Sequence, residues 1–354
     1  MVAADTFWVD GIRGNDAHDG NSEEKQGGNQ GPFKTVRKAV LSATDGDTIR
    51  IQAANGQEYD GPITLAEKKD IKITGHGGTP IIAAKIDFSP GEPNVGYGDD
   101  YGVVNLLDCK NVTLSNLKIV NHKKYTPTST TLRDTSSCAL NTARSTNVVV
   151  IDSHLKGDGK SVVLIHDNSA VTIENSKLSG YYFEVNCGAS DVIIKNCVLN
   201  QHNRAVPDSH AAINTTAGYG ALNGGPAKRI SNVVCNDVTF NMETGRAIVT
   251  GNTNDFDYFS VVRLKNPVFR FKNSTYGLVG YHSSWFGVEL ILDPRNTKIP
   301  DLKDFVSANS AKPITGFGRF VNYYDPPHHP VAGRPATFSD GLSSETLFKS
   351  LKRN

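Results

Sequence analysis

The sequence predicts an all-β fold, a single-domain parallel β-helix built from rungs of three short strands. The main observation is a recurring phrase: apolar, polar, apolar, polar, then Asn or Asp. It is clearest in "VTIENSKL" at 171–178 and "VIIKNCVL" at 192–199. The spacer between copies varies while the phrase stays constant, which is typical of a solenoid with loops inserted at one corner. An antiparallel sandwich also has short strands and turns, but it does not explain a fixed Asn in each repeat.

Each phrase predicts a strand followed by a sharp bend. The alternating apolar residues fill one face of the strand, and Asn, Asp or Gly tolerates the left-handed backbone that the bend needs. A second strand follows the bend, and a third precedes the next phrase, as in "GVVNLL" at 102–107 and "CALNTA" at 138–143. The predicted corner residues are Gly75, Asn116, Asp152, Asn175, Asn196, Asp237 and Asn273.

Both ends of the chain differ from the repeats. Apolar residues at helical spacing in "PFKTVRKAVLSATDGD" predict a helix over about 34–44, which would cap the exposed end of the solenoid core. The phrase stops after about residue 288. We therefore expect a capped β-helix over 1–288 and an irregular C-terminal tail over 289–354 that packs on it and ends in a short amphipathic helix.

Composition excludes some classes of function. The net charge is +1, so no overall attraction to nucleic acid or anionic membranes is expected. No apolar run approaches the ~18 residues of a membrane span. No signal peptide is visible, and a secreted or extracellular protein is expected if Met1 was added to a mature form; an intracellular protein is the alternative. The five Cys are irregularly spaced and fit small buried hydrophobes, with one disulfide as the alternative.

The entry segment shows a family resemblance. "FWVDGIRGNDAHDG…GPFKTVRKAV…DGDTIRIQAANGQEYDGPITL" resembles the start of right-handed parallel β-helix proteins of the pectate-lyase-like superfamily, closely over about 6–65 and generically to about 280. The resemblance implies a right-handed solenoid in which long loops wall a groove, whose floor is the outward face of the strand that follows them. The superfamily includes lyases, polygalacturonases, epimerases, fructotransferases and phage tailspikes. The resemblance therefore implies the fold more strongly than the activity.

Alternation along the third strands predicts the groove floor. If Leu140, Ile165, Val185 and Ile213 face inward, their neighbours form an outward column of Asn141, His166, Asn186 and Asn214. An imidazole, a phenol and a carboxylate on one exposed sheet can abstract and return a proton. The predicted catalytic residues are His166, Tyr182, Glu184 and His210. The predicted substrate-binding residues, on the bordering loops, are Lys156, Lys160, Arg204, Asp208, His122 and Lys124.

These residues favour a polysaccharide lyase that cleaves an acidic, uronate-containing polysaccharide by β-elimination. A glycoside hydrolase or fructan-type transferase using a carboxylate pair such as Glu184 and Asp208 is one alternative. A non-catalytic glycan-binding spike, adhesin or coat protein is another, and either a monomer or a homotrimer fits. "GNDAHDGNSEE" at 14–24 resembles a calcium loop but lacks the full spacing, so the expectation is no cofactor, with Ca²⁺ as the alternative.

Overall fold

The computed structural model describes residues 4–53, 55–85, 102–122, 137–159, 161–188, 190–202, 211–216, 230–243, 246–250, 259–271, 279–281, 286–291 and 319–323. They fall into two units. Unit 1 comprises 1–165 and 169–182, and unit 2 comprises 166–168 and 183–354.

Unit 1 has three parallel sheets, which each rung visits in turn. In order along each sheet, the first sheet contains β1 (Thr6–Val9), β2 (Thr48–Gln52), β5 (Lys72–His76), β8 (Thr113–Ser115), β11 (Val148–Ile151) and β14 (Ala170–Glu174). The second contains β3 (Glu58–Asp60), β6 (Ile81–Ala84), β9 (Lys118–Asn121), β12 (His154–Gly157) and β15 (Lys177–Gly180). The third contains β4 (Ile63–Ala66), β7 (Gly102–Leu107), β10 (Cys138–Ala143) and β13 (Ser161–His166).

Unit 2 repeats this plan. Its first sheet contains β17 (Asp191–Lys195), β20 (Ile230–Asn236), β23 (Phe259–Lys265), β26 (Phe286–Ile291) and β27 (Arg319–Tyr323). Its second contains β18 (Val198–Gln201), β21 (Thr239–Met242) and β24 (Val268–Phe271). Its third contains β16 (Phe183–Gly188), β19 (Ala211–Thr216), β22 (Arg246–Thr250) and β25 (Val279–Tyr281).

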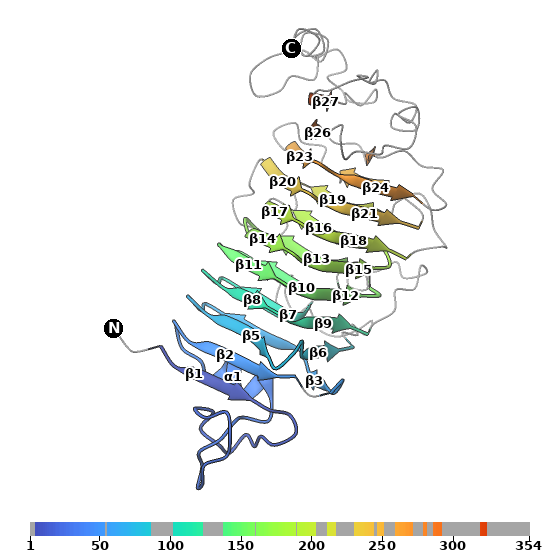
Figure 1. The fold of residues 1–354 in the computed structure, drawn as a ribbon. Coiled ribbons are helices and arrows are strands. Elements are labelled where there is room, and N and C mark those ends of the chain that lie inside the picture. Colours follow the sequence, from blue (N-terminus) through green and yellow to red (C-terminus); the bar gives the residue numbers. More distant parts are fainter. Residues whose placement is uncertain are drawn as a thin grey trace, which may run out of the picture. The chain divides into compact units, whose positions relative to one another are not determined.

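Three-strand rungs of parallel strands confirm the predicted right-handed parallel β-helix. Figure 1 shows β2, β5, β8 and β11 of unit 1 side by side as successive layers. The core-facing residues of these four strands and of β14 stack in register, and all are fully buried: Ile49, Ile73, Leu114, Val150 and Ile173. Burying each such side chain contributes about 1.5–3 kcal/mol, so the inward columns supply much of the stability.

The C-terminal end departs from the parallel pattern. β27 pairs antiparallel with β26, whereas the other paired strands described are parallel. The predicted boundary at residue 288 falls inside β26. The predicted C-terminal helix lies outside the described residues.

Most predicted corners have the expected backbone. In unit 1, φ is +52° at Asn116, +50° at Asp152 and +48° at Asn175. In unit 2 it is +49° at Asn196 and +55° at Asp237. These values lie in the left-handed region, which Asn and Asp tolerate better than other residues with a Cβ.

Two predicted corners were wrong. The last one is at Asn266, with φ +51°, because the strand that pairs with β20 is β23 and Val262 lies opposite Val233. "FRF", which the phrase predicts as the first strand of that rung, belongs to β24 in the second sheet. Gly75 lies inside β5 and its φ is not left-handed. It is needed for close approach, since a Cβ there would collide with the carbonyl oxygen of Asn116.

The capping helix is confirmed as α1 (Val36–Ser42), which lies against β1 and β2 at the N-terminal end of unit 1 (Figure 1). The Thr35 side chain caps it by accepting a 3.1 Å hydrogen bond from the Lys38 amide. Val36, Ala39 and Val40 form the buried face of the helix. The helix therefore covers apolar core that the first rung would otherwise expose.

The five cysteines behave as small hydrophobes. All are described and buried, and none of them forms a disulfide, so the disulfide alternative is wrong. Burial raises the pKa of the Cys138 and Cys235 thiols, which keeps them protonated. Among the described residues, no helix has the length and apolar character to cross a membrane.

Candidate functional site

The outward face of the third sheet in unit 2 has the predicted alternation. Val185 is paired with Ile213, and both are fully buried in the core. Glu184 and Asn186, their neighbours in sequence, therefore point to the opposite face. Asn186 lies opposite Asn214, and its Oδ1 accepts a 2.8 Å hydrogen bond from Nδ2 of Asn214. This part of the predicted outward column is confirmed.

The third sheet of unit 1 carries an amide column of its own. Asn141 lies opposite Asn105, and its Nδ2 donates a 3.2 Å hydrogen bond to Oδ1 of Asn105. The Asn105 side chain also bonds to the backbone of Gly102: its Oδ1 accepts a 2.9 Å hydrogen bond from the Gly102 amide, and its Nδ2 donates a 2.8 Å hydrogen bond to the Gly102 carbonyl. Both asparagines are fully buried. Such bonds fix the strand register, because a shifted register would leave buried amides without partners.

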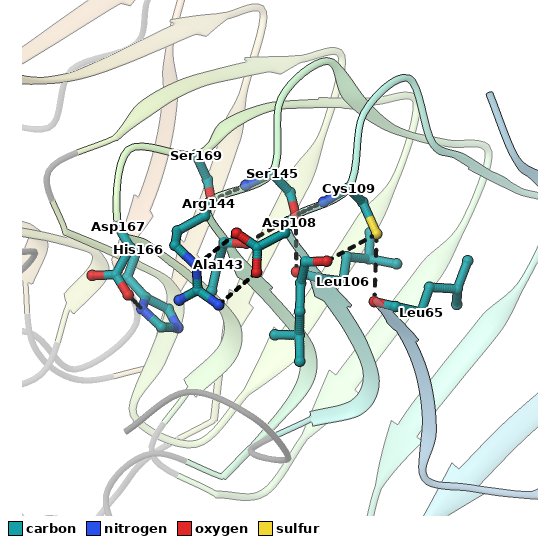
Figure 2. Close-up of polar contacts among 11 residues, drawn as sticks. Leu65, Leu106, Asp108, Cys109, Ala143, Arg144, Ser145, His166, Asp167 and Ser169 are labelled. Atoms are coloured by element: carbon teal, nitrogen blue, oxygen red, sulfur yellow. Dashed lines mark hydrogen bonds and ion pairs between the residues drawn. The ribbon is translucent and has the colours of Figure 1, made fainter. Parts of the chain in front are cut away.

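His166 ends β13 and forms a dyad with the residue that follows it. Its Nδ1 lies 3.0 Å from Oδ2 of Asp167, and both side chains are under a tenth exposed (Figure 2). Successive strand residues normally point to opposite faces. Here φ is +54° at Asp167 and +64° at Asn168, so the chain turns and the carboxylate reaches the imidazole. A carboxylate at Nδ1 orients a histidine and fixes its tautomer.

The predicted catalytic residues are buried, and the expectation of an exposed floor is wrong for those described. Relative exposure is 6% for His166, 8% for Tyr182 and 0% for Glu184. Tyr182 was expected inside a strand over 181–186, but it precedes β16, which begins at Phe183. His210 lies outside the described residues. A buried position strengthens electrostatic interactions, because the local dielectric is lower than that of water.

The predicted substrate-binding residues are spread over different elements. Lys156 lies within β12 of the second sheet, so the prediction that it borders the floor from a loop is wrong. His122 follows β9, and its Nε2 is 2.9 Å from Oε2 of Glu58. Lys160, Arg204, Asp208 and Lys124 lie outside the described residues.

The corner after the third sheet is built from a buried hydrogen-bond ladder (Figure 2). Ser145 Oγ accepts a 3.0 Å hydrogen bond from the Cys109 amide and lies 3.0 Å from the carbonyls of Leu106 and Ala143. The Ser145 amide donates in turn to Oγ of Ser169 at 3.1 Å. The ladder satisfies buried backbone groups on successive rungs and holds the ends of the third-sheet strands in place.

An ion pair on the exposed side of this corner was not predicted. Arg144 donates from Nε to Oδ1 of Asp108 and from a terminal nitrogen to Oδ2, both at 2.8 Å (Figure 2). The signal was present, because "GVVNLL" and "CALNTA" are followed by Asp and Arg at the same place in the repeat. This fork geometry aligns two rungs, and at an exposed position it contributes about 0–1 kcal/mol.

The acidic loop at 14–24 is a structural turn. Asp16 accepts hydrogen bonds from the amides of Lys34 and Thr35 at 2.9 Å and from the Thr35 hydroxyl at 2.8 Å. Asp19 accepts from the Gly31 amide at 3.3 Å. Asp16 therefore holds the loop at the start of α1, and Asp19 holds it at the preceding turn. In the part of the chain that the structure describes, no group of three or more His, Cys, Asp or Glu could hold a metal ion.

Comparisons with known proteins agree with the fold. No family model matches the sequence, and no curated protein sequence matches it. Among solved structures, pectin methylesterase PemA from Erwinia chrysanthemi matches with a TM-score of 0.51 and 12% identity, over 81% of this chain and 90% of that chain. A pectin methylesterase mutant in complex with a hexasaccharide matches with a TM-score of 0.50 and 12% identity, over 81% and 90%. This chain has the fold of the pectate-lyase-like β-helix proteins.

A pectate lyase, Pel9A, is matched with a TM-score of 0.44 and 11% identity, over 80% of each chain. At such identities the comparisons show the fold alone, and site residues have to be argued from this chain's own geometry.

Proposed function

We propose that the protein is a carbohydrate-active enzyme that cleaves an acidic, uronate-containing polysaccharide by β-elimination, with His166 as the base. The observation that carries this proposal is the buried His166–Asp167 dyad at the end of a third-sheet strand. When Nδ1 carries a proton and donates it to Asp167, Nε2 has no proton and can accept one.

The elimination is balanced within one uronate unit. The base takes the proton from the carbon next to the carboxylate, the electron pair forms a carbon–carbon double bond, and the glycosidic oxygen leaves from the adjacent carbon. That oxygen takes a proton from a general acid or from water. One product ends in an unsaturated uronate, and the other has a new reducing end.

The substrate class is supported by two further observations. Long insertions precede the third-sheet strands, and loops of this kind often form the binding face of a solenoid. The solved structures with a similar fold include pectin methylesterases, one of them in complex with a hexasaccharide.

The same neighbours favour a second candidate, hydrolysis of the carboxyl esters of an esterified polyuronate. The dyad would then activate a water molecule, which attacks the ester carbonyl and releases an alcohol. The polymer would keep its length.

The test uses polygalacturonate and its methyl ester, followed for unsaturated uronate by ultraviolet absorbance and for methanol by a coupled assay. Elimination predicts that absorbance rises with time, and that the rate of this rise is about 10²–10⁴-fold lower in His166→Ala than in wild type. Asp167→Asn should lose much of the rate as well. The control is His76→Ala, which replaces a partly exposed histidine at the end of β5 and should keep the wild-type rate. Methanol without absorbance supports the esterase. New reducing ends without either signal indicate a hydrolase, and binding without any product indicates a non-catalytic glycan-binding protein.

A further inference from the structure

The outward face of the second sheet in unit 1 carries a line of cationic side chains. His154 of β12 lies opposite Lys118 of β9 on one side and Lys177 of β15 on the other. Lys156 lies two residues along β12, on the same face. We call these four residues the lysine stripe. Their inward neighbours confirm the orientation, since all are fully buried: Ile119, Leu155 and Leu178.

The positive charge of the stripe is not neutralised by neighbouring carboxylates. Among the described residues, Lys118, Lys156 and Lys177 have no ion-pair partner. The nearest acidic strand of the same sheet is β3, which β6 separates from β9; its Glu58 is engaged by His122 at 2.9 Å, and its Asp60 is exposed on the same face. Lys177 is exposed and the other members are partly exposed, so an incoming anion can reach the ammonium groups.

The pKa of the His154 imidazole is lowered by burial and in part by the positive charges of the stripe. Burial lowers its pKa, and the charges of Lys177, Lys118 and Lys156 lower it further. Its Nε2 lies 3.3 Å from the Ser179 hydroxyl, which holds the ring between the two lysine rungs. The neighbouring charges that lower this pKa belong to three lysines, and such a group of cations can bind an anion.

We propose that the lysine stripe is a second carbohydrate-binding surface, which holds a linear polysaccharide that carries carboxylates. Successive rungs are ~4.8 Å apart, so the stripe presents cations at a regular interval along one line. A polymer with regularly spaced carboxylates can pair with several of them at once. The net charge of the whole chain is only +1, so this attraction is local to the stripe.

The stripe belongs to the second sheet of unit 1, whereas His166 and Asp167 belong to unit 2 and contribute no residue to it. The choice of a polyuronate over other polyanions rests on the proposed function, while the presence of an anion-binding surface rests on the charge pattern alone. Its role would be to hold the polymer, and no chemistry is assigned to it.

The test measures binding of fluorescent oligogalacturonate to the full chain by anisotropy. Lys118→Gln/Lys177→Gln removes two charges from the stripe, and Lys69→Gln/Lys110→Gln removes two exposed charges from the corner between the third and first sheets. The stripe variant should bind roughly fivefold or more weakly, while the corner variant should stay close to wild type. Oligogalacturonate should also raise the pKa of His154, followed by NMR, because an anion stabilises its protonated form.

Equal weakening of the two double variants would show an effect of net charge and overturn the proposal. So would wild-type protein that does not bind oligogalacturonate, or an unchanged pKa of His154 on binding. Single-stranded DNA that competes as strongly as oligogalacturonate would overturn the assignment to a polysaccharide. Binding is measured on His166→Ala as well, so a failure of the catalytic proposal leaves this result intact.

Discussion

Replacing Asp152 by Ala should destabilise the protein by an amount that the corner geometry sets. Asp152 has φ +50° and is exposed, and in the described part of the chain its side chain makes no hydrogen bond. Its amide donates to the Glu174 carbonyl at 3.2 Å, a bond that any residue other than Pro retains. The change therefore isolates the backbone strain of a Cβ in the left-handed region, which costs about 1–2 kcal/mol.

Urea unfolding followed by far-ultraviolet circular dichroism measures this cost as a lower midpoint at an unchanged slope. Asp152→Asn should match wild type, and Asp152→Gly should lie within about 0.5 kcal/mol, because glycine accepts the bend but loses more chain entropy. Asp158→Ala is the matched control, since its backbone is not left-handed. If Asp152→Ala were no less stable than Asp152→Gly, the corner would not be under the constraint that the repeated phrase implies.

Three further predictions concern unit 1. Ser145→Ala should cost about 1–3 kcal/mol in urea unfolding, because the buried Cys109 amide loses its acceptor, whereas Ser145→Cys should recover part of the loss. Gly75→Ala should destabilise more than Asp152→Ala, because the new Cβ meets backbone; equal midpoints would contradict this. The folded pKa of His154 is below its ordinary 6.5, so the unfolded chain binds protons more readily. The free energy of unfolding should therefore fall as pH drops through 6.5 towards the folded pKa, and His154→Gln should flatten that dependence.

The fold was predictable because its repeating element is local. An alternating apolar strand that ends in a left-handed Asn or Asp is a short-range signal, and it identified Asn116, Asp152 and Asn196 directly. The error at the last corner arose because "VVRLKN" and "FRFKN" both fit the phrase. Only the pairing of β23 with β20 shows that Asn266 is the corner.

The candidate site was less predictable, because it depends on what covers a face and on how the chain turns. Alternation predicts Glu184 and Asn186 on the outward face of β16, but it carries no information about what covers that face, and Glu184 is fully buried. The same rule would place Asp167 on the face opposite His166. Its left-handed backbone overrides the rule, so the dyad emerged only with the three-dimensional structure.

The most direct measurement identifies which bond of the substrate breaks. Polygalacturonate and its methyl ester are incubated with the protein in ¹⁸O-labelled water, and the masses of the products are measured by mass spectrometry. Elimination moves only a proton and an electron pair, so every oligosaccharide should lack solvent oxygen, and one end of each cut should be unsaturated. Label in a new reducing end or in a freed carboxylate would show that water attacked the substrate, and would contradict β-elimination by the His166–Asp167 dyad.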